Sequence, residues 1–297
     1  MILLSTGHAI SPRGFWYSWP VEPLVAVGLF AGLVLYLIGW KRLSLTAAAM
    51  VPRWRWWCYI ASIVTIVLAL LSPIAAYSEQ LFAMHMVQHL LLLLIAPPLL
   101  LLGAPLLPAL WALPVNARRA VGRRLAPGQV LHHLGHALTT PLIAVALYVV
   151  TVAIWHVPVM YDAAQGRTVT HDLEHLMFFG TALLYWWPVI HPSRGRRRLS
   201  YGLAVPYLVP PLFEGMLIGV LLAFSSVPLY ETYRGLDTAP IWGLSSLDDQ
   251  QLGGLIMWVP GGLFFLIPLI GVLTRLLNQE SERPYHDHVA NRASQLR

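Results

Sequence analysis

Cysteine is almost absent from this sequence, since Cys58 is the only one in 297 residues. An internal disulfide and a paired-cysteine metal or redox motif each need two thiols, so both are excluded. A soft metal ion would have to be bound through histidine or methionine. Charge is also scarce, because Asp, Glu, Lys and Arg together make up 11% of the chain. Soluble domains carry about 25% charged residues, so the composition argues against a soluble fold.

Hydrophobic residues replace the missing charge. They account for 57% of the sequence, and the mean hydropathy is +0.64. These values predict a protein with several membrane-spanning helices. The net charge of +6 would also suit a nucleic-acid-binding protein. However, the arginines lie in short clusters between apolar runs, where they set membrane topology. We therefore expect a lipid environment and no nucleic-acid partner.

Apolar windows of about 20 residues, the length that crosses about 30 Å of hydrocarbon, recur along the chain. The third window is too long for one straight helix, and Pro97-Pro98 and Gly103-Ala104-Pro105 indicate that it kinks or continues along the membrane surface. No cleavage pattern marks the first window as a removable signal peptide. The sequence thus predicts an all-α polytopic membrane domain over residues 1–275 and a cytoplasmic C-terminal tail over 276–297. The seven predicted transmembrane helices cover residues 21–40, 56–78, 80–111, 138–158, 171–191, 201–224 and 250–275.

Basic residues mark one side of this predicted bundle. The clusters follow the first, third, fifth and seventh spans, which places all of them on the same side of the membrane. Short cytoplasmic loops are enriched in Lys and Arg. This pattern predicts an N-terminus outside the cell membrane and a C-terminus in the cytoplasm. The basic residues are Lys41, Arg42, Arg53, Arg55, Arg118, Arg119, Arg123, Arg124, Arg194, Arg196, Arg197, Arg198, Arg283, Arg292 and Arg297.

Five histidines gather at the outer side when this topology is applied. His85 with His89, and His171 with His175, are spaced by four residues, so each pair shares one face of its helix about 6 Å apart along the axis. His156 lies at the outer end of the span between the two pairs. Imidazole binds Cu, Zn, Fe and Ni ions, and ionisable groups inside a membrane usually have a function. The group therefore predicts a metal or haem site, although each histidine alone could simply hydrogen-bond a neighbouring helix.

Four further residues are candidates for a supporting role. Glu214 lies near the middle of the sixth span after three prolines, so it either lines a polar path toward the histidines or makes a hydrogen bond between helices in its protonated form. Asp249 and Gln250 begin the seventh span, where a carboxylate caps a helix N-terminus or orients a ligating imidazole. Met257 offers a thioether, which favours Cu(I), although membrane methionines are more often packing residues.

Four separate stretches carry recognisable motifs. They are His85-Met-Val-Gln-His89 with the Ala-Pro-Pro-Leu-Leu-Leu-Leu-Gly-Ala-Pro of residues 96–105, Trp155-His156-Val157-Pro158, His171-x-x-x-His175 with Trp186-Trp187, and Asp249-Gln250-x-x-x-Gly254-Leu255-x-Met257-Trp258. Together they resemble the multi-spanning CtaG family of cytochrome c oxidase assembly factors, and the similarity extends from residue 21 to 275 in the same order and spacing. The resemblance implies a seven-span bacterial inner-membrane protein that matures haem-copper oxidases, with the family's histidines at the five positions above.

The resemblance implies a function without covalent catalysis. We expect the protein to bind copper on the extracytoplasmic side and to hand it to an oxidase subunit or a copper chaperone, rather than to act as an enzyme. Two alternatives stay open. One is a membrane electron carrier whose histidines hold haem or serve a quinone, and the other is a copper or proton-coupled transporter with Glu214 on the path. A scaffold that only holds oxidase subunits together would not need the histidines.

Overall fold

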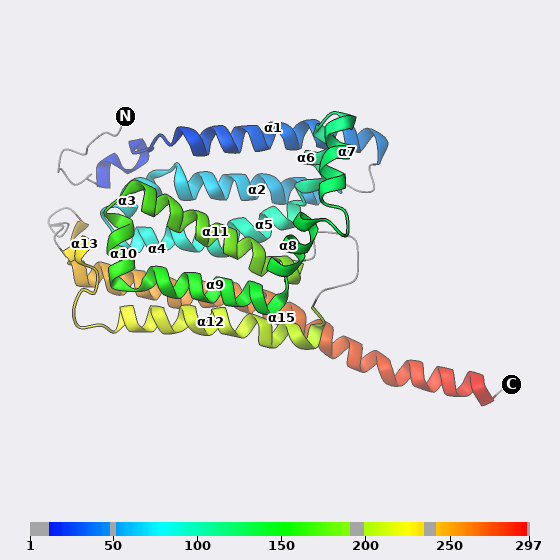
Figure 1. The fold of residues 1–297 in the computed structure, drawn as a ribbon. Coiled ribbons are helices and arrows are strands. Elements are labelled where there is room, and N and C mark those ends of the chain that lie inside the picture. Colours follow the sequence, from blue (N-terminus) through cyan, green and yellow to red (C-terminus); the bar gives the residue numbers. More distant parts are fainter. Residues whose placement is uncertain (1–11, 48–51, 191–198, 235–241, 296–297) are drawn as a thin grey trace.

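The computed structural model describes residues 12–47, 52–190, 199–234 and 242–295, and these residues form helices and no strands. The long helices lie side by side as a bundle (Figure 1). They are α1 Pro23–Thr46, α2 Arg53–Leu70, α9 Pro141–His156, α11 Thr168–Ile190, α12 Tyr201–Ala223 and α15 Ser246–Gln295. A further long helix consists of three consecutive parts, α4 Phe82–Leu90, η3 Leu91–Ile95 and α5 Ala96–Gly103. Shorter helices connect them: η1 Pro12–Tyr17, α3 Pro73–Ser78, α6 Leu106–Ala112, α7 Val115–Arg124, α8 Val130–Leu138, α10 Pro158–Gln165 and α13 Glu231–Arg234.

Five helical segments of the described chain are long and apolar enough to cross a membrane, and α8 with α9 forms a sixth span if the 66° bend between them is accepted. α11 is not among them, although it has 23 residues, because its first turns are polar. It still packs inside the bundle against α5 and α9 (Figure 1). The expectation of an all-helical protein with several membrane spans is confirmed. The count of seven stays a prediction that depends on α11.

The third predicted span is a helix with a π-helical turn in its middle. In η3 the Ala96 amide donates to the Leu91 carbonyl, five residues back. Pro97 has no amide hydrogen, so the Leu93 carbonyl loses its usual helical donor. The Trp186 indole of α11 donates to that carbonyl instead, at 3.0 Å. The helix then continues to Gly103 and ends where Ala104 adopts a left-handed conformation with φ of 46°. The proline pair therefore alters the helix without ending it.

Glycines allow α12 and α15 to approach closely. A Cβ atom on Gly254 of α15 would lie 2.5 Å from the Ala223 amide nitrogen, and one on Gly219 of α12 would lie 2.8 Å from the Gly254 carbonyl oxygen. Close packing of small residues is a main source of helix association in lipid, because lipid tails are as apolar as leucine. This contact fixes α15 against α12, and with it the residues at the start of α15.

The two ends of the bundle differ in charge. The basic end contains the end of α1, the start of α2, and α7 with its four arginines, whereas the histidine end contains α3, α10, α13 and the first turns of α4 and α11 (Figure 1). Arg42 belongs to the basic end, where it donates to the carbonyls of Trp111 at 3.0 Å and Ala112 at 2.9 Å. The predicted separation of basic clusters from the five histidines is confirmed for the described residues.

Parts of the predicted basic side lie outside the described residues, namely the arginines within 191–198 and Arg297. α15 continues through the predicted tail to Gln295 without a break. Which end faces the cytoplasm, and whether residues 276–297 form a separate unit, stay predictions.

Candidate metal centre

Four of the five predicted histidines bring their rings together at the histidine end. His85 and His89 come from α4, and their Nε2 atoms lie 2.6 Å apart. His171 and His175 come from the first turns of α11, with ring centroids 4.2 Å apart. The His85 centroid lies 5.4 Å from that of His171 and 6.1 Å from that of His175. The four-residue spacing therefore places both pairs on the facing sides of α4 and α11, as the sequence indicates.

His156, at the end of α9, lies beside this group. Its ring centroid is 6.0 Å from that of His89. Nδ1 donates to the Val152 carbonyl at 2.8 Å, and a carbonyl can only accept, so the ring hydrogen is on Nδ1. The other nitrogen, Nε2, keeps its lone pair and has no hydrogen-bond partner within the described chain. His156 therefore has a free Nε2 lone pair that could bind a metal ion, and its ring lies beside that of His89.

Glu174 completes the cluster, and the sequence reasoning missed it. It is fully buried, and its Oε1 lies 3.7 Å from Nε2 of His89. Neither carboxylate oxygen has a hydrogen-bond partner in the part of the chain that the structure describes. Glu174 follows His171 by three residues and therefore shares its helix face. The sequence His171-Asp-Leu-Glu174-His175 therefore already places the carboxylate on the same helix face as the His171 imidazole.

Two overlapping sets of ligand atoms form within this cluster. His85, His89 and His175 make one set, His85, His171 and Glu174 make the other, and in each set the atoms lie within 4.8 Å of one another. Three imidazoles, or two imidazoles and a carboxylate, are ligand sets for zinc and copper. Buried polar atoms without partners are rare in native proteins, and a bound ion is one explanation for them. Within the cluster such atoms are Nδ1 of His89, Nε2 of His156, His171 and His175, and both oxygens of Glu174.

Short helices outside the spans hold the His85 ring from its other side. Nε2 of Gln165 lies 2.9 Å from Nδ1 of His85, and the Tyr161 hydroxyl lies 3.0 Å from the same atom. The Tyr233 hydroxyl lies 3.2 Å from it and donates to the Ser78 carbonyl at 2.7 Å. Burial raises the pKa of Tyr161 and of Tyr233 above the usual value of 10, so both phenols stay protonated. These contacts turn Nε2 of His85 toward His89.

The sequence gives little indication of this support. Gln165, Tyr161 and Tyr233 lie in α10 and α13, which are short helices of eight and four residues outside the predicted metal-binding helices. They reach His85 only through the tertiary fold, so no spacing rule within one helix would find them.

The residues predicted for a supporting role occupy different places. Asp249 is buried and accepts hydrogen bonds from the Phe82 amide at 2.6 Å and the Ala83 amide at 3.0 Å. It therefore caps α4, the helix that carries His85 and His89, rather than its own helix. Gln250 accepts from the Leu229 amide at 2.5 Å and so ties down the segment after α12. Met257 packs in an apolar cluster with Phe82, Met86, Tyr161, Leu222, Tyr230 and Tyr233.

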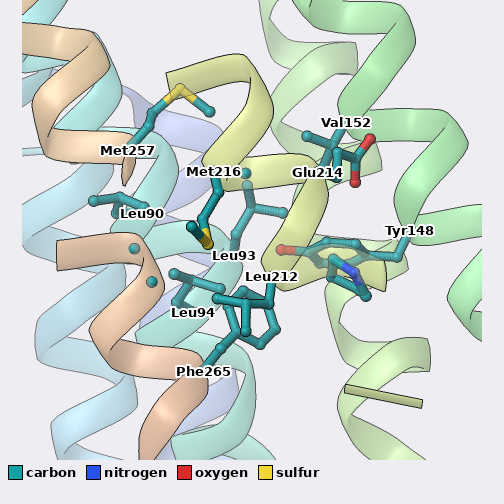
Figure 2. A pocket seen from close by; sticks show the side chains of 14 residues that line it. Leu90, Leu93, Leu94, Tyr148, Val152, Leu212, Glu214, Met216, Met257 and Phe265 are labelled. Carbon is teal, nitrogen blue, oxygen red and sulfur yellow. The ribbon is translucent and has the colours of Figure 1, made fainter. Parts of the chain in front are cut away.

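Glu214 lies apart from the histidines. It lines a cavity bounded by the end of α4, η3, α9, α12 and α15, next to Val152 of α9 (Figure 2). Both of its carboxylate oxygens are buried and have no hydrogen-bond partner among the described residues. Val152 contacts both regions, because its side chain lines the cavity and its carbonyl accepts the hydrogen bond from His156.

Three curated mycobacterial proteins are similar to this chain. The chain is 27% identical over 267 residues to uncharacterised proteins of Mycobacterium bovis and Mycobacterium tuberculosis, a match that covers 88% of this chain and 40% of each relative. An uncharacterised protein of Mycobacterium leprae is 25% identical over 273 residues, which cover 90% of this chain and 40% of that protein. The chain thus spans 40% of the length of these curated relatives. No solved structure matches.

The family comparison covers most of the chain. The model of the cytochrome c oxidase caa3 assembly factor matches residues 34–279, a range that contains the five histidines, Glu174, Glu214 and Asp249. The resemblance seen in the sequence motifs is therefore confirmed. The chain belongs to the cytochrome c oxidase caa3 assembly factor family.

Proposed function

We propose that this assembly factor binds a copper ion in the histidine cluster and delivers it to an oxidase subunit or a copper chaperone. The observation that carries the proposal is the group of buried nitrogen and oxygen atoms, contributed by α4, α9 and α11, that lack hydrogen-bond partners among the described residues. Burial of such atoms costs free energy unless a partner satisfies them, and a cation would do so. Copper suits an imidazole-rich site and the needs of a haem-copper oxidase.

The ligand sets assign a role to each side chain. His85, His89 and His175 would hold the ion as neutral imidazoles, and His171 with Glu174 would offer an adjoining position that shares His85. The carboxylate of Glu174 would offset part of the ion's charge where an isolated charge is costly. Because copper is cargo in this function, the protein makes and breaks no covalent bond, which agrees with a role other than that of an enzyme.

The location of the site follows from the charge of the bundle. We place the basic end in the cytoplasm, because Lys and Arg are enriched in cytoplasmic loops. The histidine end then faces the extracytoplasmic side of the bacterial inner membrane. In this orientation the N-terminus is outside, and the cluster lies at the end of the bundle that an oxidase subunit or a copper chaperone on that side would meet.

The spacing of His85 and His89 supports an ion better than a haem held by that pair. The two rings lie on one face of α4 with centroids 4.1 Å apart, whereas bis-histidine haem ligation needs imidazoles on opposite faces of the macrocycle. A haem held between facing helices would instead use His175 of α11 with His85 or His89, whose ring centroids lie 6.1 Å and 5.8 Å away. An absorption spectrum of the purified protein separates the two, because a Soret band would contradict the copper proposal.

Metal analysis of the purified protein tests the proposal. We expect stoichiometric copper in the wild type, and loss of copper and of oxidase assembly when His85→Ala and His89→Ala are combined. The matched control combines His133→Ala with His136→Ala, two exposed histidines of α8 at the basic end. It should keep both copper and oxidase assembly. A wild-type protein without copper, or a folded double variant of His85 and His89 that still supports the oxidase, would contradict the proposal.

A further inference from the structure

A cavity of about 40 Å³ lies between α4, η3, α9, α12 and α15 (Figure 2). An ordered water occupies roughly 10–15 Å³ of such space, so the cavity has room for a small number of waters. Glu214 from α12 and Tyr148 from α9 are the titratable residues among the described side chains that line it. α4, η3 and α15 contribute apolar side chains and glycines to the same lining. The cavity therefore combines apolar walls with one carboxyl and one hydroxyl group.

No Lys or Arg belongs to the described lining of the cavity, so no cationic side chain there stabilises a charge on Glu214. Both carboxyl oxygens are buried without a hydrogen bond of normal geometry within the described residues, and only the nearby backbone of Ala153 favours the charged form. In Figure 2 Glu214 lies beside Val152 and close to the ring of Tyr148. A carboxylate inside a membrane is costly unless it is paired or protonated. Glu214 is thus placed to exchange a proton with water in the cavity rather than to form an ion pair.

Polar groups continue from this cavity toward the basic end. Pro210 and Pro211 lack amide hydrogens, so the carbonyls four residues before them lose their helical donors. The Tyr207 hydroxyl donates to the Tyr185 carbonyl at 2.7 Å. The Tyr185 ring lies 4.8 Å from that of Tyr148 and 5.0 Å from that of Tyr207, and its buried hydroxyl has no hydrogen-bond partner in the described chain. The rings of three tyrosines, from α9, α11 and α12, therefore pack in succession away from Glu214.

The cavity is also close to the proposed metal site. Val152 lines it, and the Val152 carbonyl accepts the hydrogen bond from His156. Four residues of α9 separate the two, which is about 6 Å along the helix axis. Leu90, the neighbour of His89 in the chain, lines the cavity as well. Two charges about 10 Å apart at an effective dielectric constant of about 20 change each other's binding by roughly tenfold.

We propose that Glu214 is a proton-binding site coupled to cation binding in the histidine cluster. When a cation enters the cluster, the O–H bond of the Glu214 carboxyl group breaks and the electron pair stays on the carboxylate. The proton passes to water in the cavity, which the Tyr148 hydroxyl also lines. When the cation leaves, a proton returns to Glu214. Because such coupling is reciprocal, a fall in pH would weaken cation binding through Glu214.

This coupling rests on the proposed function, since it needs a cation in the cluster, and it adds a second buried group that responds to that cation. The experiment adds Cu²⁺, or Zn²⁺ as an ion without redox chemistry, to purified protein in lightly buffered lipid nanodiscs. Protons released and ions bound are measured together. Glu214→Gln should release up to one proton fewer per bound ion and bind roughly tenfold more weakly. Its affinity should also depend less steeply on pH.

Controls separate the possible outcomes. Glu231→Gln removes an exposed carboxylate that is paired with Arg234, and it should behave as the wild type does. Tyr148→Phe should slow proton release and leave the number of protons unchanged. Equal proton release and equal pH dependence in the wild type and Glu214→Gln would overturn the coupling and leave the copper proposal intact. A wild type that binds no cation would overturn both proposals.

A wild-type measurement covers the case in which Glu214→Gln does not fold. Infrared difference spectra of the wild type and of Glu174→Gln should both lose a protonated carboxyl band when the ion binds, because Glu214 is present in both. A band that stays unchanged in both proteins would overturn the coupling.

Discussion

Histidines at the two ends of the bundle share one chemistry and have opposite surroundings. His85, His89 and His175 are 0%, 2% and 8% exposed, whereas His133 and His136 are exposed on α8. Nδ1 of His133 lies 2.9 Å from the Gln129 carbonyl of its own helix turn, and solvent reaches the rest of the ring. The buried histidines instead come from several helices and keep nitrogens without partners. Residue type alone therefore does not distinguish the two groups, whereas the gathering of several buried, unpartnered imidazole and carboxylate atoms in one place does.

Close helix contacts occur at both ends, and α8 is the open element. At the histidine end, α4 is capped from α15, and α15 lies against α12 at glycines. At the basic end, a Cβ atom on Gly39 of α1 would lie 1.7 Å from the Pro108 carbonyl oxygen of α6, whereas one on Gly135 of α8 would have no described atom within 4 Å. The contact between α12 and α15 leaves little room for rearrangement beside the histidines, as a site with several ligands from different helices requires.

The largest effect is expected from a methyl group added where α12 and α15 meet. Gly254→Ala should destabilise the fold by about 1–3 kcal/mol, because the new Cβ would overlap the α12 backbone. Gly135→Ala, in the open helix α8, should be neutral or stabilising by up to about 1 kcal/mol. Thermal unfolding of both variants in lipid nanodiscs measures the difference. Similar unfolding temperatures would show that the glycine contact does not hold the histidine end together.

The second prediction compares the copper affinity after loss of a buried carboxylate, Glu174, and of an exposed one, Glu231. Glu174→Gln keeps the shape of the side chain and removes its charge, so copper affinity should fall about tenfold, within the range seen when groups that tune a metal site are lost. Glu231→Gln, exposed at the same end of the bundle, should leave the affinity unchanged. Competition with a copper chelator measures both. An unaltered affinity in Glu174→Gln would mean that imidazoles alone bind the ion.

The sequence predicted those parts of the site that depend on one helix at a time. The apolar windows located the five helical segments that are long and apolar enough to cross a membrane. The four-residue spacing of His85 and His89 placed both imidazoles on one side of α4, as the ring contacts confirm. The three-residue spacing from His171 also places Glu174 on the same face of α11. Its contact with His89 of α4 follows only from the packing of the two helices. Features local to the chain were therefore predictable, and the meeting of two helices was predictable only in part.

The remaining features depend on contacts between distant segments. Asp249 lies at the start of α15 and reads as a cap for that helix, yet it binds the amides of α4. Tyr161 and Tyr233 reach His85 from short helices at the histidine end. The polar first turns of α11 also make a count of the spans from apolar windows uncertain, because the same residues that build the site lower the hydropathy of the helix. The residues that form the cluster therefore weaken the hydropathy pattern of the helix that carries them.

The smallest effect concerns two side chains that bind helix termini at opposite ends. Asp249→Ala should cost about 0.5–2 kcal/mol, because the Phe82 and Ala83 amides lose a buried acceptor, and Asp249→Asn should cost less because the amide oxygen still accepts one bond. Arg42→Ala removes donors to exposed carbonyls of α6, so it should change stability by less than about 0.5 kcal/mol.

Copper affinity separates the two positions further than stability does. Loss of the Asp249 cap frees the first turn of α4, whose next turns carry His85 and His89, so Asp249→Ala should weaken copper binding as well as lower the unfolding temperature. Arg42→Ala should leave copper binding unchanged, because α6 contributes no ligand atom to the cluster. If both variants weakened copper binding equally, general stability rather than the position of α4 would determine the site, and the contrast between the two ends would fail.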